Sequence, residues 1–268
     1  VVLISASDTK VYDGLPLTNS KVDAKGYGFV KGDEVTYEVE GTITNVGSEI
    51  NSFTYSFVDK NVEANYDITK VEGVLIVTPN TSLVVDIIEP TDTFEYNGET
   101  HFLRDFEVKT NMEGQYSISD FVYSGVAEVS GSLVGKYSMD LQPSQFKNIN
   151  RNFEDVQFNV ISKDLVIKPR EKVIVEIKEN GSEVIYDGKL HEVNGYVFHS
   201  NDSLYLAEFM RCNNPEAAHV EGTDVGVYDM ELLPSYFENI NPNFKDVTFV
   251  VVDSALTIFR QEGVVVTI

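Results

Sequence analysis

The chain repeats one pattern along its length, and this repetition constrains its fold more than any other feature. Residues 134–160 (VGKYSMDLQPSQFKNINRNFEDVQFNV) return without a gap as residues 225–251 (VGVYDMELLPSYFENINPNFKDVTFVV), with 17 of 27 positions identical. The first third of the chain carries a more distant copy. A Tyr-Asp/Asn-Gly triplet precedes each copy, starting at Tyr12, Tyr96 and Tyr186, which lie 84 and 90 residues apart. The spacing predicts three modules of similar length.

We expect the modules to span residues 1–81, 82–170 and 171–259. A unit of this size can fold by itself, because independent folding becomes difficult only below about 40 residues. Solenoid repeats of about 20 to 50 residues, in contrast, depend on their neighbours. Residues 260–268 (RQEGVVVTI) resemble residues 170–177 (REKVIVEI), so we expect either a further module or a C-terminal strand to begin there.

Strand patterns dominate each module. Apolar and polar residues alternate from Val156 to Val160, with the period of a half-buried strand, and a polar turn at residues 162–164 leads into a second apolar run. We expect such a β-hairpin to close every module. Helical signals are limited to single turns, near residues 119–122, 143–146 and 234–237. The chain is therefore expected to be all-β with minor helical turns. Its three tandem domains, arranged end to end, are either small β-sandwiches or β-grasp-like sheets.

Some positions keep their residue type from module to module and are expected to be structural. The glycine of each triplet tolerates a positive φ, and the Asp or Asn before it favours a tight turn. Aromatic residues recur while their neighbours change charge, as Glu154 against Lys245 does, which indicates that packing holds the rings. These structural repeat residues are Tyr12, Tyr96, Tyr186, Gly14, Gly98, Gly188, Phe153 and Phe244.

The composition excludes several classes of partner. With 43 acidic and 20 basic residues, the chain carries a formal net charge of −23, whereas nucleic-acid binding needs a basic surface. No apolar run approaches the length of about 18 residues that spans a bilayer, so direct membrane insertion is not expected. The single cysteine, Cys212, allows no intrachain disulfide.

No pattern of catalytic residues is found in the sequence. His101 and His191 share one position in the repeat, but the first module has Leu17 there. The other two histidines and Cys212 have no counterparts, and no zinc-ligand spacing is present. We therefore expect no enzymatic activity and no catalytic, cofactor-binding or metal-binding residues.

Three asparagine-rich segments, at residues 59–67, 148–155 and 239–246, allow two interpretations. Oxygen ligands on a loop suit calcium. The segments nevertheless contain Lys60, Arg151 and Lys245 and lack the Asp-x-Asp-x-Asp-Gly order of a calcium loop. Asparagine side chains also bind turn backbone without any metal. We expect structural asparagine turns and no cofactor, with calcium as the alternative.

The repeat resembles the YDG/MBG-type tandem repeats of large cell-surface proteins, chiefly of Gram-positive bacteria. The resemblance lies in the Tyr-Asp-Gly triplet, a glycine-containing strand and the segment DVGVYDMELLPSYFENINPNFKDVTFVVVDSALTI. The first module, with YDGLPLT and NYDITKVEGVLIVTP, is similar to a variant of the same class. The resemblance implies a secreted or cell-wall-attached extracellular location and a stalk or adhesin role.

The expected function is that of a non-catalytic stalk or spacer, whose partners are the neighbouring modules of the same chain. The alternative is an adhesin-type module that binds a host or environmental glycan or protein. An exposed aromatic or apolar patch in one module that its sisters lack would favour the alternative. The irregular segment at residues 209–222 of the third module is where such a patch is expected.

Overall fold

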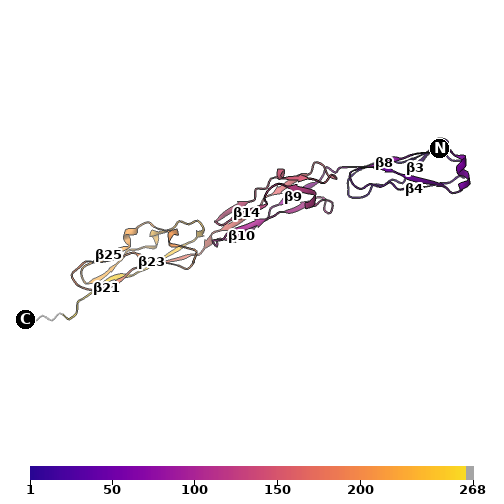
Figure 1. Cartoon of the computed structure of the whole chain (residues 1–268). Helices are drawn as coiled ribbons and strands as arrows, with labels where there is room; N and C mark the ends of the chain where they lie inside the picture. The colour runs from indigo at the N-terminus through magenta and orange to yellow at the C-terminus, as the bar shows by residue number, and fades with distance from the viewer. Residues whose placement is uncertain (264–268) are drawn as a thin grey trace, which may run out of the picture. The chain divides into compact units, whose positions relative to one another are not determined.

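The structure, a computed structural model, describes residues 1–263, and their regular elements are β-strands and short 3-10 helices (Figure 1). This confirms the predicted all-β class with minor helical turns. Three of the 3-10 helices lie where the sequence predicts a helical turn: η2 (Ile118–Asp120), η3 (Pro143–Gln145) and η6 (Pro234–Tyr236). Within residues 1–263, no helix is both long and apolar enough to cross a membrane.

The elements follow the order of the three predicted modules. The first contains β1 (Val2–Ser5), β2 (Asp8–Val11), β3 (Val22–Lys25), β4 (Val35–Val39), β5 (Gly47–Asn51), β6 (Phe53–Phe57), η1 (Lys60–Asn65), β7 (Thr69–Val71) and β8 (Gly73–Thr78). The second contains β9 (Val84–Ile88), β10 (Asp92–Glu95), β11 (His101–Arg104), β12 (Glu107–Thr110), η2, β13 (Phe121–Tyr123), β14 (Glu128–Gly131), β15 (Gly135–Ser138), η3, β16 (Phe146–Asn148), β17 (Gln157–Ile161) and β18 (Asp164–Lys168). The third follows with β19 (Arg170–Glu171), β20 (Ile174–Glu179), β21 (Ser182–Ile185), β22 (His191–Asn194), β23 (Tyr196–Ser200), η4 (Ala207–Phe209), β24 (Met210–Cys212), η5 (Pro215–Ala217), β25 (His219–Gly222), β26 (Gly226–Asp229), η6, β27 (Phe237–Asn239), β28 (Phe244–Lys245), β29 (Thr248–Val252) and β30 (Ala255–Phe259).

In the third module, β20 and β21 run parallel to β29 and β30 and pair with them. Two strands are each interrupted once, so that β20 continues as β21 and β29 continues as β30. Strand β20 pairs antiparallel with β23 and parallel with β29, while β30 pairs parallel with β21 and antiparallel with β26. The first module repeats these pairings in β3-β1-β7 and β2-β8-β5. In both modules a parallel pair of broken strands therefore lies at the centre, with one antiparallel strand on each outer side.

The β-hairpin predicted at the end of each module is wrong. Strands β17 and β18 do not pair with each other, and instead each runs parallel to a segment of the module's first strand, β9 and β10 respectively. The polar residues between them interrupt one continuing strand. There the N–H of Lys163 donates to Glu89 Oε2 at 3.1 Å, so a side chain takes the place of a ladder bond.

A buried acceptor recurs at these interruptions. Glu89 is fully buried and also accepts a hydrogen bond from the N–H of Leu141 at 3.0 Å. Glu179, 2% exposed, accepts from the N–H of Ser254 at 2.9 Å, and Ser5 Oγ takes the same role for Gly73 at 2.8 Å. Since a buried N–H without an acceptor is costly, these side chains allow the break in each last strand.

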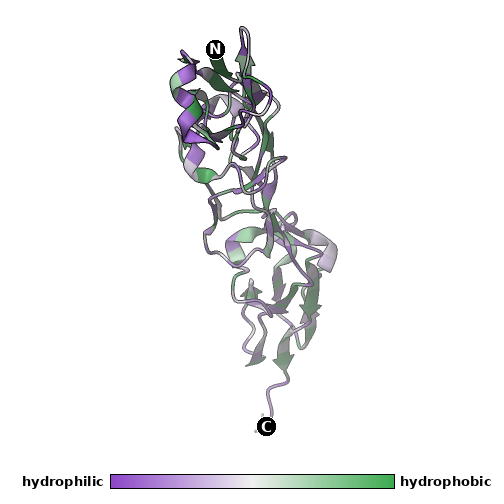
Figure 2. Cartoon of the chain, turned by 90° about the vertical axis from the view of Figure 1, so that its right-hand side faces the viewer, coloured by the Kyte–Doolittle hydropathy of each residue, from purple (hydrophilic) through white to green (hydrophobic). Residues whose placement is uncertain are grey.

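The chain forms two compact units. The first comprises Val1–Glu89, Asp105–Ala127 and Asp140–Lys163, and the second comprises Pro90–Arg104, Glu128–Met139 and the described residues from Asp164 onward. The second predicted module contributes to both units, so the boundaries near residues 81 and 170 stay a prediction. Figure 2 shows strands with hydrophobic segments (green) connected by turns that are largely hydrophilic (purple).

Candidate functional sites at the module joints

The three triplets form the same turn. The backbone φ is +77° at Gly14, +80° at Gly98 and +74° at Gly188, a conformation that glycine adopts without strain. The side chain before each glycine accepts from the N–H two residues further on. These bonds join Asp13 to Leu15 (2.9 Å), Asn97 to Glu99 (3.0 Å) and Asp187 to Lys189 (3.0 Å). The predicted tight turns are therefore present in all three modules.

The recurring histidines belong to these turns. His101 Nε2 lies 3.1 Å from Asn97 Oδ1, and His191 Nε2 lies 2.9 Å from Asp187 Oδ1. The hydrogen bond from the Lys189 backbone, followed by that from His191, lowers the pKa of Asp187. In the first module the side chain of Lys10 makes the contact with Asp13 instead, and with the Leu15 backbone it lowers the pKa of Asp13. A turn-stabilising role therefore accounts for the histidines.

The tyrosine of the first triplet packs against the second module, inside the first compact unit. The rings of Tyr12 and Phe153 meet edge to face, with centroids 5.3 Å apart and planes at 82°. Tyr12 is 8% exposed and Phe153 is 2% exposed. Phe153 also meets Tyr116 of its own module edge to face at 5.4 Å. The repeated aromatics thus form a joint between modules.

Asparagine side chains complete this first joint. Asn152 Oδ1 accepts from the N–H of Val46 at 2.9 Å, and Asn152 Nδ2 donates to Asn45 Oδ1 at 3.0 Å. The backbones pair as well: Asn80 N–H donates to Asn152 O at 3.0 Å, and Glu154 N–H donates to Asn80 O at 3.1 Å. Both ring packing and directional hydrogen bonds therefore fix the register of the joint.

The second joint, inside the second compact unit, uses the same parts. Tyr96 meets Phe244 edge to face at 5.5 Å, and Asn243 Oδ1 accepts from the N–H of Val134 at 2.8 Å. The N–H of Arg170 donates to Asn243 O at 2.9 Å, and the Arg170 side chain pairs with Asp202.

Two of the three asparagine-rich segments are turns held by their own amide groups, whereas residues 59–67 contain the 3-10 helix η1, whose N-cap is Asp59. Asn148 Oδ1 accepts from the N–H of Asn150 at 3.0 Å, and Asn150 Oδ1 accepts from that of Asn152 at 2.9 Å. Asn239 and Asn241 act in the same way in the third module, at 3.1 and 2.9 Å. In these two turns the side-chain amide oxygens thus bind backbone N–H groups, as expected for structural turns.

The repeated aromatic residues at the two joints are buried or partly buried, and the one repeated aromatic outside a joint is exposed. Tyr12, Phe153 and Phe244 are buried, and Tyr96 is partly buried. The prediction is wrong for Tyr186, which is 39% exposed. The difference follows from the joint, because each tyrosine is covered by the module that follows its own.

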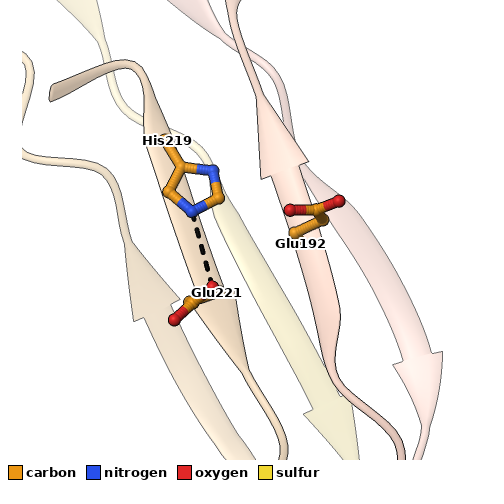
Figure 3. A group of neighbouring side chains, drawn as sticks. All are labelled: Glu192, His219 and Glu221. Atoms are coloured by element: carbon orange, nitrogen blue, oxygen red, sulfur yellow. Dashed lines mark ion pairs between the residues drawn. The ribbon is translucent and has the colours of Figure 1, made fainter. Parts of the chain in front are cut away.

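A second group of side chains, on the surface of the third module, has ligand-type atoms close together (Figure 3). Three ligand-type atoms lie within 4.8 Å of one another, one from each of Glu192, His219 and Glu221. All three residues are exposed. Glu192 on β22 is directly opposite Glu221 on β25. His219 Nε2 lies 3.6 Å from Glu221 Oε2, and its Nδ1 lies 2.7 Å from Asn194 Oδ1. His–Glu–Glu is a donor set that a divalent metal ion accepts. Sequence reasoning missed the group because only the cross-strand register brings Glu192 to His219 and Glu221, which lie on one strand.

Comparisons with known proteins do not assign the chain to a family. No family model matches it, and no curated protein matches it. Among solved structures, a similar chain is described as "Dscam1 isoform 9.44, N-terminal four Ig domains (with zinc)". That chain is 11% identical, with a TM-score of 0.20, over 97% of the present chain and 72% of its own length. Similarity at this level carries no argument, so the fold rests on the strand pairings themselves.

Proposed function

We propose that this chain is a non-catalytic tandem-repeat segment of an extracellular bacterial surface protein and acts as a stalk or spacer. The observation that carries the proposal is that one joint is built twice from equivalent residues: Tyr12 with Phe153 and Asn152, and Tyr96 with Phe244 and Asn243. These two joints support the proposal that the partners of each module are the neighbouring modules of the same chain.

Such joints suit a spacer because they limit bending. An aromatic pair contributes about 0.5–1.5 kcal/mol beyond its buried area, and a hydrogen bond of defined geometry adds about 0.5–1.5 kcal/mol. Both contributions are lost if one module swings away from the next. The net charge of −23 supports the same role, since like-charged surfaces repel and keep a chain soluble. The extracellular, wall-attached or secreted location is proposed from the resemblance to YDG/MBG-type repeats.

The adhesin alternative has less support from the irregular segment of the third module. Phe209, Met210 and Cys212 pack against the core formed by residues such as Tyr205 and Phe237. No large hydrophobic residue of the described positions 209–222 is exposed. The segment therefore fills the core of its own module and does not present an apolar binding patch.

Small-angle scattering on a length series tests the spacer. A repeat unit of residues 82–170 would be inserted once or twice between the second and third modules, so that the same joint residues recur. A spacer predicts a maximum dimension that rises by a constant increment with each insertion. A control series with Tyr→Ala and Asn→Ala changes at the joints, which leave the strands intact, should give a broader distribution of dimensions. Dimensions that stay those of a compact globe would refute the proposal, and selective binding on a glycan and matrix-protein array would favour the adhesin.

A further inference from the structure

Among residues 1–263, the third module ends in a copy of the surface that the other two modules use at their joints, and no described residue covers this copy. We call it the Tyr186 face, defined by the Tyr186 ring, the N–H of Val225 and the backbone of Gln261. Tyr186 N–H donates to Phe259 O at 2.9 Å, as Tyr12 N–H does to Thr78 O and Tyr96 N–H does to Lys168 O. These identical bonds fix the equivalences. Tyr186 corresponds to Tyr12 and Tyr96, Val225 to Val46 and Val134, and Gln261 to Asn80 and Arg170.

In the described residues the Tyr186 face lacks the partners that cover its counterparts. Tyr186 is 39% exposed against 8% for Tyr12, and its ring makes no aromatic contact within residues 1–263. Val225 is 50% exposed, whereas Val46 and Val134 are partly buried. No side-chain acceptor from residues 1–263 reaches the Val225 N–H, although Val46 and Val134 each have one.

The chemistry of a fitting occupant follows from the two covered joints. It must bring an aromatic ring edge-on to Tyr186 and an uncharged amide oxygen to the Val225 N–H. In both joints two consecutive residues deliver these groups, Asn152-Phe153 and Asn243-Phe244. Their spacing is fixed by the asparagine turn, in which each amide oxygen binds the N–H two residues later.

We propose that the Tyr186 face is a docking site for a further repeat module whose tip carries an Asn-x-Asn-x-Asn-Phe turn. The inference rests on the proposed function as a tandem array and names the partner that continues it. The Gln261 backbone belongs to the face because its equivalents donate across the covered joints, Asn80 N–H to Asn152 O at 3.0 Å and Arg170 N–H to Asn243 O at 2.9 Å.

A second copy of the chain does not supply this turn. The corresponding tip of the first module carries Tyr66, whose hydroxyl donates to Asp33 Oδ2 at 2.6 Å and whose ring stacks on Phe57 at 5.4 Å. The asparagine turns of the second and third modules are already occupied at the joints within the two units. The occupant is therefore a module that follows in an array, and the Tyr186 face is not a dimer interface.

Amide hydrogen exchange on an extended chain tests the proposal. The tested protein would consist of residues 1–261 followed by a second copy of residues 171–259. Gln261 then takes the place that Arg170 has before the third module. We expect the Val225 amide to exchange about tenfold or more slowly than in the parent, because it gains an acceptor. The Val46 and Val134 amides, protected in both proteins, are internal references. Asn243→Ala made only in the appended copy should return Val225 to the parent rate and leave the strand amides of the appended module protected.

The proposal is overturned if Val225 exchanges at the parent rate while the appended module is folded. Residues 82–169 provide a second appended probe, and failure of both copies to fold at this position would also count against the docking site. Val225 protection that grows with the concentration of the unextended chain would mean self-association in place of module docking. Scattering on the same extended protein separates the two proposals: a longer particle with an unprotected Val225 retains the spacer and removes the docking site.

Discussion

Tyr12 and Phe153 belong to different predicted modules, yet their rings lie edge to face with centroids 5.3 Å apart. Tyr96 and Phe244 repeat the relationship at 5.5 Å. Because Phe153 also touches Tyr116, one ring belongs to the core of its own module and to the joint with the previous one. Folding of the second module and its attachment to the first are therefore coupled.

A double-mutant cycle on Tyr12→Leu and Phe153→Leu measures this coupling. We expect an interaction energy of about 0.5–1.5 kcal/mol, since leucine keeps apolar volume but loses the edge-to-face geometry. Phe153→Ala should cost about 3–5 kcal/mol because it leaves a cavity. Urea unfolding provides both values. Purely additive single changes would mean that the ring contact contributes nothing to the joint.

Asn243→Ala removes the acceptor of the Val134 N–H. A partly buried donor then lacks a partner, which should lower the free energy of unfolding by about 1–3 kcal/mol. Asn213→Ala is the matched control, because the exposed Asn213 makes only a long side-chain contact, 3.4 Å from Glu238 Oε2. We expect the control to stay within about 0.5 kcal/mol of the parent. Equal effects of the two changes in thermal unfolding would contradict the role of Asn243.

The sequence predicts which residues recur but not what they touch. Equivalents of Tyr12 and of Phe153 recur in other modules, so the repeat alone assigns each ring to the core of its own module. Only the fold shows that the two rings meet across a joint. The polar residues 162–164 have the composition of a reversal, but Glu89, far away in the sequence, binds Lys163 N–H and lets the strand continue. Likewise, Glu192 and Glu221 become neighbours through strand register, which is set by long-range pairing.

Glu89→Gln probes the buried acceptor of the second module. Both carboxylate oxygens of Glu89 accept backbone N–H groups, from Leu141 and Lys163. A glutamine places an NH2 donor against one of them, so we expect a loss of about 1–3 kcal/mol. Glu113→Gln, at an exposed position, controls for the change in net charge. Unfolding curves in urea compare the two, and equal stability would contradict the double-acceptor role.

Calcium is expected to leave the protein unchanged. The amide oxygens of Asn148, Asn150 and Asn152 accept bonds from backbone or joint N–H groups, so a cation would compete with those bonds for the same oxygens. We predict the same melting temperature in EDTA and in millimolar calcium chloride. A calcium-dependent rise that Asn148→Ser abolishes would instead assign the ion to this turn.

Alkaline pH should destabilise the third module through Tyr205. This side chain is 1% exposed, and its burial raises the pKa of Tyr205 to about 12, above the ordinary value of about 10. Below pH 10 the phenol is protonated in both the folded and the unfolded state, and its contribution to stability is fully present. Between pH 10 and 12 the unfolded state loses the proton while the folded state keeps it. Stability therefore falls through this window, by up to about 3 kcal/mol.

Tyr205→Phe tests the assignment, because phenylalanine keeps the ring and cannot ionise. The variant loses the hydroxyl that lies 3.2 Å from both Phe209 O and Asn239 Oδ1, so it should be less stable than the parent at neutral pH. Its stability should nevertheless decline less steeply between pH 10 and 12. Urea unfolding at each pH, followed by circular dichroism, gives the pH dependence of stability for the parent and for the variant. In a titration followed by tyrosinate absorbance, the variant should show one late-ionising tyrosine fewer than the parent. Parallel slopes for parent and variant would remove Tyr205 as the cause of the alkaline loss.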